Sequence, residues 1–332
     1  MKAEDINVSY EYALKLAPLD LKNKIQHSVE IIRKAEKIAL IYDPENGFYN
    51  TFSGGKDSQA LYYIVKMSGV KFQTHMSFTS VDPADVVRFV KIEYPSVIKH
   101  KPQISIYKKA IEIGLLPTMS KRWCCKEYKE IGGAGKVALI GIRSEESIRR
   151  SKRNEVEVSS KKFSGNIDEF NEWSNKQIKR KKKRSFKNQD EFSLKNDNEI
   201  RCINGKDSIL ISPIFDWTLK DVWYFLNNII KAPHCKIYDE GQTRIGCIMC
   251  PMASLKQIQK DVKKFPYVKK KWIDAIKEIR RMGGFYVYQF TNNPNATEDE
   301  ISENIFEYWV SKKSYNKWYA DKFLQQKIDF DK

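Results

Sequence analysis

The chain has 332 residues, 41% of them hydrophobic, so it is long enough to bury one large α/β core or two smaller ones. Its 59 Lys and Arg against 42 Asp and Glu give a net charge of +17, which creates a positive field that attracts nucleotides, nucleic acids and other polyanions. No apolar run approaches the roughly 20 residues of a membrane helix, and acidic residues follow Met1 where a signal peptide would be basic, so we expect a cytoplasmic protein. Six cysteines in such a chain favour metal ligation or sulfur chemistry over disulfides.

Helices and strands are expected to alternate through the first half of the chain. Apolar residues recur every three to four positions from 21 to 40, which predicts an amphipathic helix. An aromatic strand over 48–52 then runs into a glycine loop. After the loop we expect helices over 58–68 and 83–94, and strands over 71–78, near 97–98 and over 137–142. This alternation predicts an α/β fold with a doubly wound, mostly parallel sheet.

The composition changes between residues 151 and 208, where large apolar residues become rare and a basic block occupies 179–184. We interpret this segment as a mobile basic insertion, whose block either binds nucleic-acid phosphates or is simply solvated. After this segment we expect a strand over 209–214 and a helix over 217–230. The chain beyond Pro251 is predicted to be helical, and we expect its many aromatic residues to lie in the core. The predicted organisation is a helical segment at 1–40, a nucleotide-binding domain at 41–235 and a cysteine-bearing turn with a helical C-terminal region at 236–332.

The glycine loop carries the first chemical signal. Ser53-Gly54-Gly55-Lys56-Asp57-Ser58 lies between a predicted strand and a predicted helix, so its backbone N–H groups converge on one concavity that suits phosphate. Glycines allow close approach of oxygens, Lys56 adds a positive charge, and Asp57 either caps the helix or helps to hold Mg²⁺. The string is not the GxxxxGK[ST] pattern, so hydrolysis of a γ-phosphate is not implied.

Paired cysteines carry the second signal. Cys124-Cys125 and Cys247-Ile248-Met249-Cys250 suit both zinc and iron–sulfur ligation. Adjacent cysteines strain to reach one small tetrahedral ion but readily meet separate irons of a cubane, so the pattern favours a [4Fe–4S] cluster over zinc. Cys235 is a possible substitute for one of the four, and buried reduced thiols without any metal are the alternative.

The loop resembles the SGGxDS PP-loop of ATP pyrophosphatases, and the motifs around it resemble those of the phosphoadenosine phosphosulfate (PAPS) reductase-like superfamily. These motifs are Trp123-Cys124-Cys125-Lys126, Gly141 to Ser147, Pro213 to Thr218, and Tyr238 to Gly241 continuing through Pro251. Within the superfamily the chain looks most similar to prokaryotic and phage PAPS reductase proteins and to the DNA phosphorothioation sulfurtransferase type, DndC. The resemblance implies an adenine nucleotide alpha hydrolase-like fold.

In chemical terms the resemblance implies an enzyme that binds Mg²⁺ and ATP, adenylylates an acceptor and releases pyrophosphate into the loop. Lys56 and Asp57 would be catalytic, and the whole loop 53–58 would bind the nucleotide together with Arg143, Glu146, Arg149 and Arg244. Cys124, Cys125, Cys247 and Cys250 would hold the cluster. A sulfur donor such as a cysteine desulfurase would then displace AMP, with Cys202 or Cys235 as a candidate persulfide carrier, and the acceptor would be DNA, tRNA or a small molecule.

Two departures from the sulfonucleotide reductases favour ATP as the substrate. Those enzymes use a thiol near the C-terminus as nucleophile, whereas this sequence has no cysteine after Cys250. They also carry a degenerate form of the loop, whereas this chain has Ser-Gly-Gly-Lys-Asp-Ser. A reductase that uses an external thiol is the first alternative. A nucleic-acid-binding module with a regulatory nucleotide site is the second.

Overall fold

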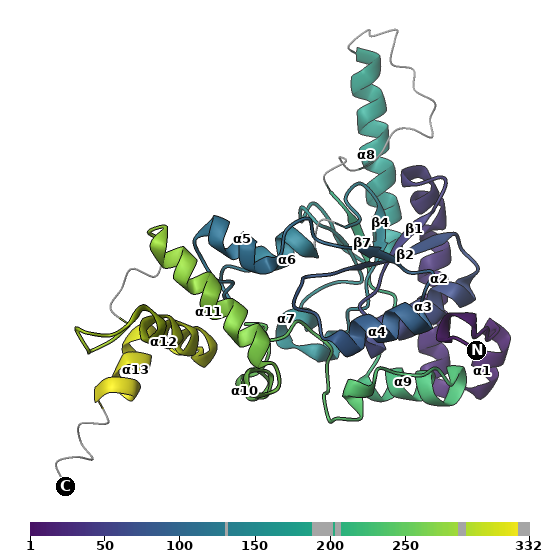
Figure 1. Cartoon of the computed structure of the whole chain (residues 1–332). Helices are drawn as coiled ribbons and strands as arrows, with labels where there is room; N and C mark the ends of the chain where they lie inside the picture. Colours follow the sequence, from purple (N-terminus) through teal and green to yellow (C-terminus); the bar gives the residue numbers. More distant parts are fainter. Residues whose placement is uncertain (130–131, 188–201, 203–206, 285–289, 325–332) are drawn as a thin grey trace. The chain divides into compact units, whose positions relative to one another are not determined.

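The computed structural model describes residues 1–129, 132–187, 202, 207–284 and 290–324, with the backbone alone for 181–187. These residues form two compact units (Figure 1). The first comprises Met1–Ser77, Ala84–His100 and Ile131–Ile245, and the second comprises Phe78–Pro83, Lys101–Glu130 and Gly246–Lys332. Among the described helices, none combines the length and the apolar character needed to cross a membrane.

A seven-stranded sheet forms the centre of the first unit, in the order β3-β2-β1-β4-β7-β5-β6. The first five strands in this order are parallel, and β5 and β6 add an antiparallel edge. The chain moves outward from β1 to β2 and β3, and then continues on the other side of β1 with β4 and β7, which confirms the doubly wound sheet. The parallel strands are β1 (Phe48–Thr51), β2 (Phe72–Ser77), β3 (Ile98–His100), β4 (Val137–Leu139) and β7 (Ile209–Ile211).

Helices flank this sheet close to the positions that the sequence predicts. Helix α2 (Leu19–Tyr42) packs against α3 (Lys56–Ser68), which also contacts α9 (Leu219–Tyr224) and the π-helical turn η5 (Phe225–Ile230). Helix α2 buries an apolar stripe because Leu21, Ile25 and Ile32 fall on one face, each at most 2% exposed. The remaining helical segments of this unit are η1 (Ala3–Asp5), α1 (Tyr10–Leu16), α4 (Ala84–Glu93), η2 (Ser144–Glu146), α7 (Ile148–Ser151) and η6 (Lys236–Tyr238).

The structure differs from the expected mobile segment over the first part of 151–208. Strand β5 (Val156–Val158) pairs with β7 and buries both of its valines, and β6 (Ser164–Gly165) pairs with β5. Helix α8 (Ile167–Lys187) follows and contains the backbone of the basic block. The sequence gives no warning of β5 because its two valines lie among charged and polar residues, whereas β4 and β7, equally short, lie in continuous apolar runs. Lys179 and Arg180 are exposed, whereas the other four side chains of the block lie outside the described ones.

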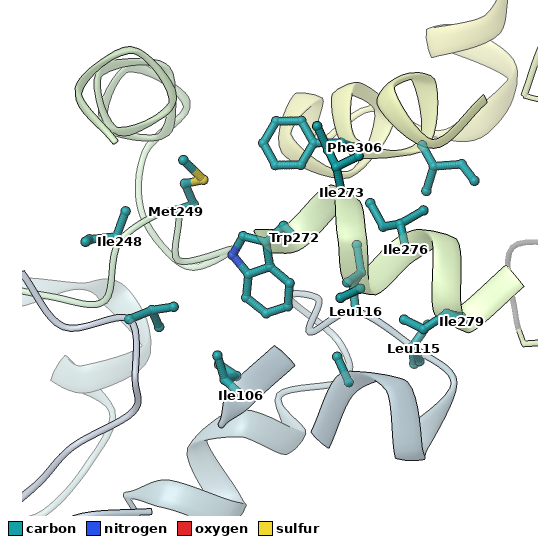
Figure 2. Close-up of a cluster of buried hydrophobic side chains, with 14 of the residues drawn as sticks. Ile106, Leu115, Leu116, Ile248, Met249, Trp272, Ile273, Ile276, Ile279 and Phe306 are labelled. Carbon is teal, nitrogen blue, oxygen red and sulfur yellow. The ribbon is translucent and has the colours of Figure 1, made fainter. Parts of the chain in front are cut away.

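The second unit is helical, as expected for the C-terminal region. Its helices are α5 (Ile106–Ile113), α6 (Trp123–Tyr128), α10 (Leu255–Lys264), α11 (Pro266–Arg281), α12 (Glu298–Ser311), α13 (Tyr315–Tyr319) and the π-helical turn η7 (Ala320–Leu324). Figure 2 shows their shared core, where Trp272 and Phe306 are 2% and 1% exposed. Aromatics of the C-terminal region therefore contribute to packing, as predicted.

Candidate nucleotide-binding site

The glycine loop lies where a doubly wound sheet has its topological switch point. Strand β1 has β2 on one side and β4 on the other, and residues 53–58 follow its carboxyl end. Gly141, just beyond β4, approaches the same loop so closely that a Cβ atom there would lie 3.2 Å from the Asp57 carbonyl oxygen. The loops after β1 and β4 therefore meet at the switch point, the place where open α/β sheets bind ligands.

Gly54 shapes the loop through its backbone and its lack of a side chain. Its φ is +71°, in the left-handed region that favours glycine. A Cβ atom there would lie 2.7 Å from Cγ2 of Val90, which belongs to α4. The loop is thus held against α4, and no larger residue fits without displacement.

Helix α3 begins at Lys56 with Gly55 as N-cap, and no side chain caps it, so Asp57 does not have the capping role that the sequence allowed. Instead, the Lys56 N–H donates to the Tyr238 hydroxyl at 3.0 Å, and the Ser53 N–H donates to the Ser58 hydroxyl at 3.2 Å. In the part of the chain that the structure describes, the N–H groups of Gly54, Asp57 and Ser58 have no protein acceptor. Three donors at a helix N-terminus suit an anion.

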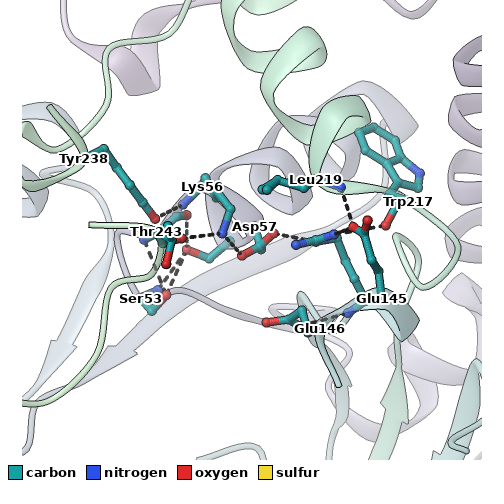
Figure 3. A network of polar contacts seen from close by, with 12 residues as sticks. Ser53, Lys56, Asp57, Glu145, Glu146, Trp217, Leu219, Tyr238 and Thr243 are labelled. Atoms are coloured by element: carbon teal, nitrogen blue, oxygen red, sulfur yellow. Dashed lines mark hydrogen bonds and ion pairs between the residues drawn. The ribbon is translucent and has the colours of Figure 1, made fainter. Parts of the chain in front are cut away.

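Charged side chains surround this N-terminus, as Figure 3 shows. The Lys56 ammonium is 4% exposed, and it donates to the Asp57 carboxylate at 3.0 Å and to the Thr243 carbonyl at 3.3 Å. Arg143 is 3% exposed, and its Nε donates to the other Asp57 oxygen at 2.7 Å. Its Nη1 donates to Glu145 at 2.7 Å and to the Trp217 carbonyl at 3.2 Å. One carboxylate thus holds two buried cations.

Two other arginines were predicted for the site. Arg244 contributes its positive charge to the site, whereas Arg149 does not. Arg149 is exposed, while its neighbour Arg150 is half-buried and forms an ion pair with Glu146. Burial lowers the pKa of Arg150 to about 10, and the positive charge of Arg244 acts in the same direction. Glu146 also accepts the Arg143 backbone N–H at 3.1 Å, so this carboxylate orients arginines.

The structure adds Tyr238, Thr243, Glu145 and Arg150 to the predicted residues. Burial raises the pKa of Tyr238, whose hydroxyl therefore stays protonated while it accepts from Lys56. Arg150 could have been predicted from the sequence, because Glu146 lies four residues before it, the spacing at which charged side chains pair on a helix. Tyr238 belongs to a recognised motif, but its hydrogen bond with Lys56 joins residues 182 positions apart, which no local sequence pattern indicates.

The four predicted cluster cysteines all belong to the second unit. The Cys124 thiol donates a hydrogen bond to Cys125, which lowers the pKa of Cys125, and Arg122 and Lys129 act in the same direction. Burial alone would lower the pKa of Lys129, but the Cys247 thiol to which it donates raises that pKa overall. Charges on Cys247 and Cys250 in turn act on Cys124, so the two pairs share one neighbourhood.

These residues suit a group that accepts hydrogen bonds and binds thiolates. The indole N–H of Trp123, next to Cys124, is buried and has no partner among the described residues, and the Lys129 cation offsets negative charge. Within the same described ranges, however, no three His, Cys, Asp or Glu side chains are placed to hold a single metal ion.

The remaining two cysteines lie in the first unit and are buried. Burial raises the pKa of Cys235, which is 1% exposed. The Cys202 thiol lies 3.2 Å from the Tyr42 hydroxyl and lines a cavity of about 320 Å³ beside α2 and α8. Neither thiol is presented at the surface, where a persulfide carrier would meet its partner.

Curated relatives match this chain over short stretches. An uncharacterised protein of Methanocaldococcus jannaschii is 38% identical over 73 residues, which are 22% of this chain and 15% of that protein. An adenosine 5'-phosphosulfate reductase of Oceanobacillus iheyensis is 24% identical over 176 residues, 50% of this chain and 54% of that protein. The chain thus spans about half or less of the length of these relatives.

Two solved structures are similar at low identity. The FMN adenylyltransferase of Candida glabrata in complex with FAD and inorganic pyrophosphate has a TM-score of 0.42 and 14% identity, over 75% of this chain and 73% of that one. The phosphoadenylyl-sulfate reductase of Candida auris in a phosphate complex has a TM-score of 0.38 and 15% identity, over 67% and 93%.

The model of the phosphoadenosine phosphosulfate reductase domain matches residues 48–253, which is more than half of the chain and includes the glycine loop and both cysteine pairs. The chain therefore belongs to the phosphoadenosine phosphosulfate reductase domain family.

Proposed function

We propose that this protein is an ATP pyrophosphatase that adenylylates an acceptor and so activates it for sulfur transfer. The observation that carries the proposal is the uncapped start of α3, where three unpartnered N–H groups meet the buried Lys56 ammonium. An acceptor hydroxyl attacks the α-phosphorus of ATP, the bond between that phosphorus and the bridging oxygen breaks, and pyrophosphate leaves. The N–H donors and Lys56 stabilise the charge that develops on the leaving pyrophosphate.

Asp57 has a positioning role in this proposal. Both of its oxygens accept from cations, Lys56 and Arg143, so the carboxylate fixes Lys56 at the helix N-terminus. That environment does not suit a Mg²⁺ ligand, because two positive groups already occupy the oxygens of the carboxylate. Any Mg²⁺ would therefore be carried by the phosphates of the nucleotide, and no step here depends on it.

The cysteine pairs are proposed to hold a [4Fe–4S] cluster, with zinc as the alternative. Cys124, Cys125, Cys247 and Cys250 supply the four thiolates that such a cluster needs. The unpartnered Trp123 N–H and the Lys129 ammonium, which donates to Cys247, favour a group with several negative acceptor atoms. When bound, the cluster would supply either a site for sulfur or a structural clamp.

The sulfur donor and the acceptor belong to the same proposal. The outer sulfur of a protein persulfide, such as that of a cysteine desulfurase, would attack the adenylylated acceptor atom and displace AMP, which forms a disulfide between the acceptor and the donor cysteine. A second thiol would then reduce this disulfide and so leave the sulfur on the acceptor. Nucleic acid is one candidate acceptor, and the basic block at 179–184 is one candidate contact for it.

A sulfonucleotide reductase with an external thiol is the second candidate, favoured by the similarity to an adenosine 5'-phosphosulfate reductase over half of this chain. The two candidates differ in their products, because adenylylation releases pyrophosphate and reduction releases sulfite. A binding module releases neither.

The decisive experiment measures both products. Anaerobically purified protein is incubated with labelled ATP and with DNA, tRNA or small-molecule acceptors, and in parallel with adenylyl sulfate and a thiol. We expect pyrophosphate that depends on ATP and acceptor, and its loss in Lys56→Ala but not in Lys91→Ala, which removes an exposed lysine of α4. Sulfite without pyrophosphate would establish the reductase instead.

A further inference from the structure

Helix α10 belongs to the second unit (Figure 1). It carries four lysines that the proposed chemistry does not use. Lys256, Lys260, Lys263 and Lys264 are all exposed. Their spacing of four, three and one places them along one side of the helix, over about 12 Å at 1.5 Å per residue. We call these four residues the α10 stripe.

Three lysines of the α10 stripe, Lys256, Lys260 and Lys263, have no acid of their own segment as an ion-pair partner among the described residues. Residues 255–271 contain seven lysines and a single acid, Asp261. Asp261 is 5% exposed and points inward, where its carboxylate accepts from the Met249 N–H at 2.8 Å and from Gln257 at 2.7 Å. Within the described residues, Lys256, Lys260 and Lys263 have no ion-pair partner.

In contrast to these three lysines of the α10 stripe, two basic residues elsewhere in this unit form ion pairs. Lys277 forms an ion pair with Asp299 at 2.5 Å, and Arg281 forms one with Glu298 at 3.0 Å. Helix stability accounts for only part of the stripe: Lys263 and Lys264 lie in the last turn of α10, where the helix macrodipole favours a positive charge, but Lys256 lies in the first turn, where it disfavours one. Like charges four residues apart also repel one another by a few tenths of a kcal/mol.

An exposed aromatic follows the α10 stripe. Tyr267, three residues after Lys264, is 66% exposed. The Lys271 ammonium lies 4.7 Å from the centre of its ring. Lysines that neutralise phosphates next to an open aromatic face are the combination with which proteins bind single-stranded nucleic acid.

The buried face of α10 argues against a membrane as the partner. Ile258 is 2% exposed, and α10 packs on α11 and α12, so its apolar side is not available for insertion into lipid. We propose that the α10 stripe and Tyr267 form a binding surface for single-stranded nucleic acid, with the lysines on the phosphates and the tyrosine stacked on a base. This surface does not depend on adenylylation at the glycine loop.

The test compares two variants of the full chain with the same loss of charge. In the first, the four residues of the α10 stripe are replaced by Gln (K256Q, K260Q, K263Q, K264Q). In the control, four exposed lysines of the first unit are replaced by Gln: Lys15, Lys37, Lys91 and Lys220. Fluorescence anisotropy measures binding to a labelled 20-mer of single-stranded DNA or RNA between 50 and 300 mM salt.

We expect the stripe variant to bind at least tenfold more weakly, and its plot of log K against log salt to flatten by up to about 3, from about 0.7 for each of four lost phosphate contacts. The control should change less than twofold. Tyr267→Ala should weaken binding without changing the slope, because stacking releases no counterions.

Equal affinity and slope in the stripe variant and the control would overturn the proposal. So would binding to vesicles of anionic lipid in place of the 20-mer. ATP binding, measured on the same samples, should be the same in all of them. A protein that binds the 20-mer but releases no pyrophosphate would refute the proposed chemistry and leave this surface intact.

Discussion

Replacing Asp57 with alanine should destabilise the first unit as well as impair catalysis. From the sequence, this side chain is expected to cap the helix or to help hold Mg²⁺. In the structure its carboxylate accepts from Lys56 and Arg143, which are 4% and 3% exposed. Without it, Lys56 keeps only the Thr243 carbonyl, 187 residues away in the sequence, and Arg143 keeps Glu145 and the Trp217 carbonyl.

Removing one partner of a buried ion pair typically costs about 3–5 kcal/mol. Asp57 itself is 17% exposed, so water enters part of the space, and we expect about 3 kcal/mol. At about 2–4 °C per kcal/mol for a domain of this size, the melting temperature should fall by about 6–12 °C. Thermal unfolding followed by circular dichroism measures the shift.

Two further measurements separate this explanation from general damage. Asp85→Ala removes a carboxylate paired with the exposed Arg88 and Lys236, so it should change the melting temperature by less than 2 °C, as is usual for surface pairs. Pyrophosphate added to Asp57→Ala should recover more stability than it gives the wild type, because it offers an anion to the same two cations. A melting temperature of Asp57→Ala within 2 °C of the wild type would refute the reasoning.

Three further predictions address the cluster, the loop and the effect of pH. Anaerobically prepared protein should contain about four irons per chain, and Cys247→Ser should lose iron and acid-labile sulfide while the matched Cys202→Ser retains them; stoichiometric zinc without sulfide would favour the zinc alternative. Gly54→Ala should abolish nucleotide binding and cost more stability than Gly69→Ala, because both have a positive φ, but only at Gly54 does the new Cβ meet a neighbour, Val90, at 2.7 Å; equal costs would contradict this. Burial and the neighbouring His100 lower the pKa of His75 to about 4, whereas an unfolded histidine titrates near 6.5. The unfolded state therefore takes up a proton that the folded state does not, and stability should fall as the pH drops from about 6.5 to 4, by up to about 3 kcal/mol. Urea unfolding of wild type and His75→Gln across this range checks the sign, since the variant should lose less stability on acidification.

Local patterns sufficed to predict the sheet and its loop. Strands β1 and β2 and helices α2 and α3 lie within a few residues of the predicted ranges, because each is long enough to show its periodicity. The glycine loop was predictable because two glycines followed by Lys, Asp and Ser, between a strand and a helix, are typical of a phosphate-binding loop. Strands β5 and β6 were missed, since they lie in a segment poor in large apolar residues, without the apolar runs that marked β4 and β7.

Contacts between distant segments were beyond local patterns. The second unit assembles from three separate stretches of chain, and its cysteine pairs were linked by motif resemblance rather than by any spacing rule. Tyr238 reaches Lys56 across 182 residues, and Arg143 reaches Asp57 across 86. Such contacts depend on the strand order of the sheet, which a single sequence specifies only through the complete fold.

The charge around the glycine loop shows what this difference means for the chemistry. The site predicted from the sequence has four cations, Lys56, Arg143, Arg149 and Arg244, and two carboxylates, Asp57 and Glu146, a balance of +2. In the structure, Arg150 takes the place of Arg149 and Glu145 joins the carboxylates, so the local balance is +1. A nearly neutral set of charges does not by itself attract a polyphosphate strongly. Directional N–H donors at the start of α3 must then supply the selectivity for phosphate, while the carboxylates hold the cations in fixed positions before the ligand arrives.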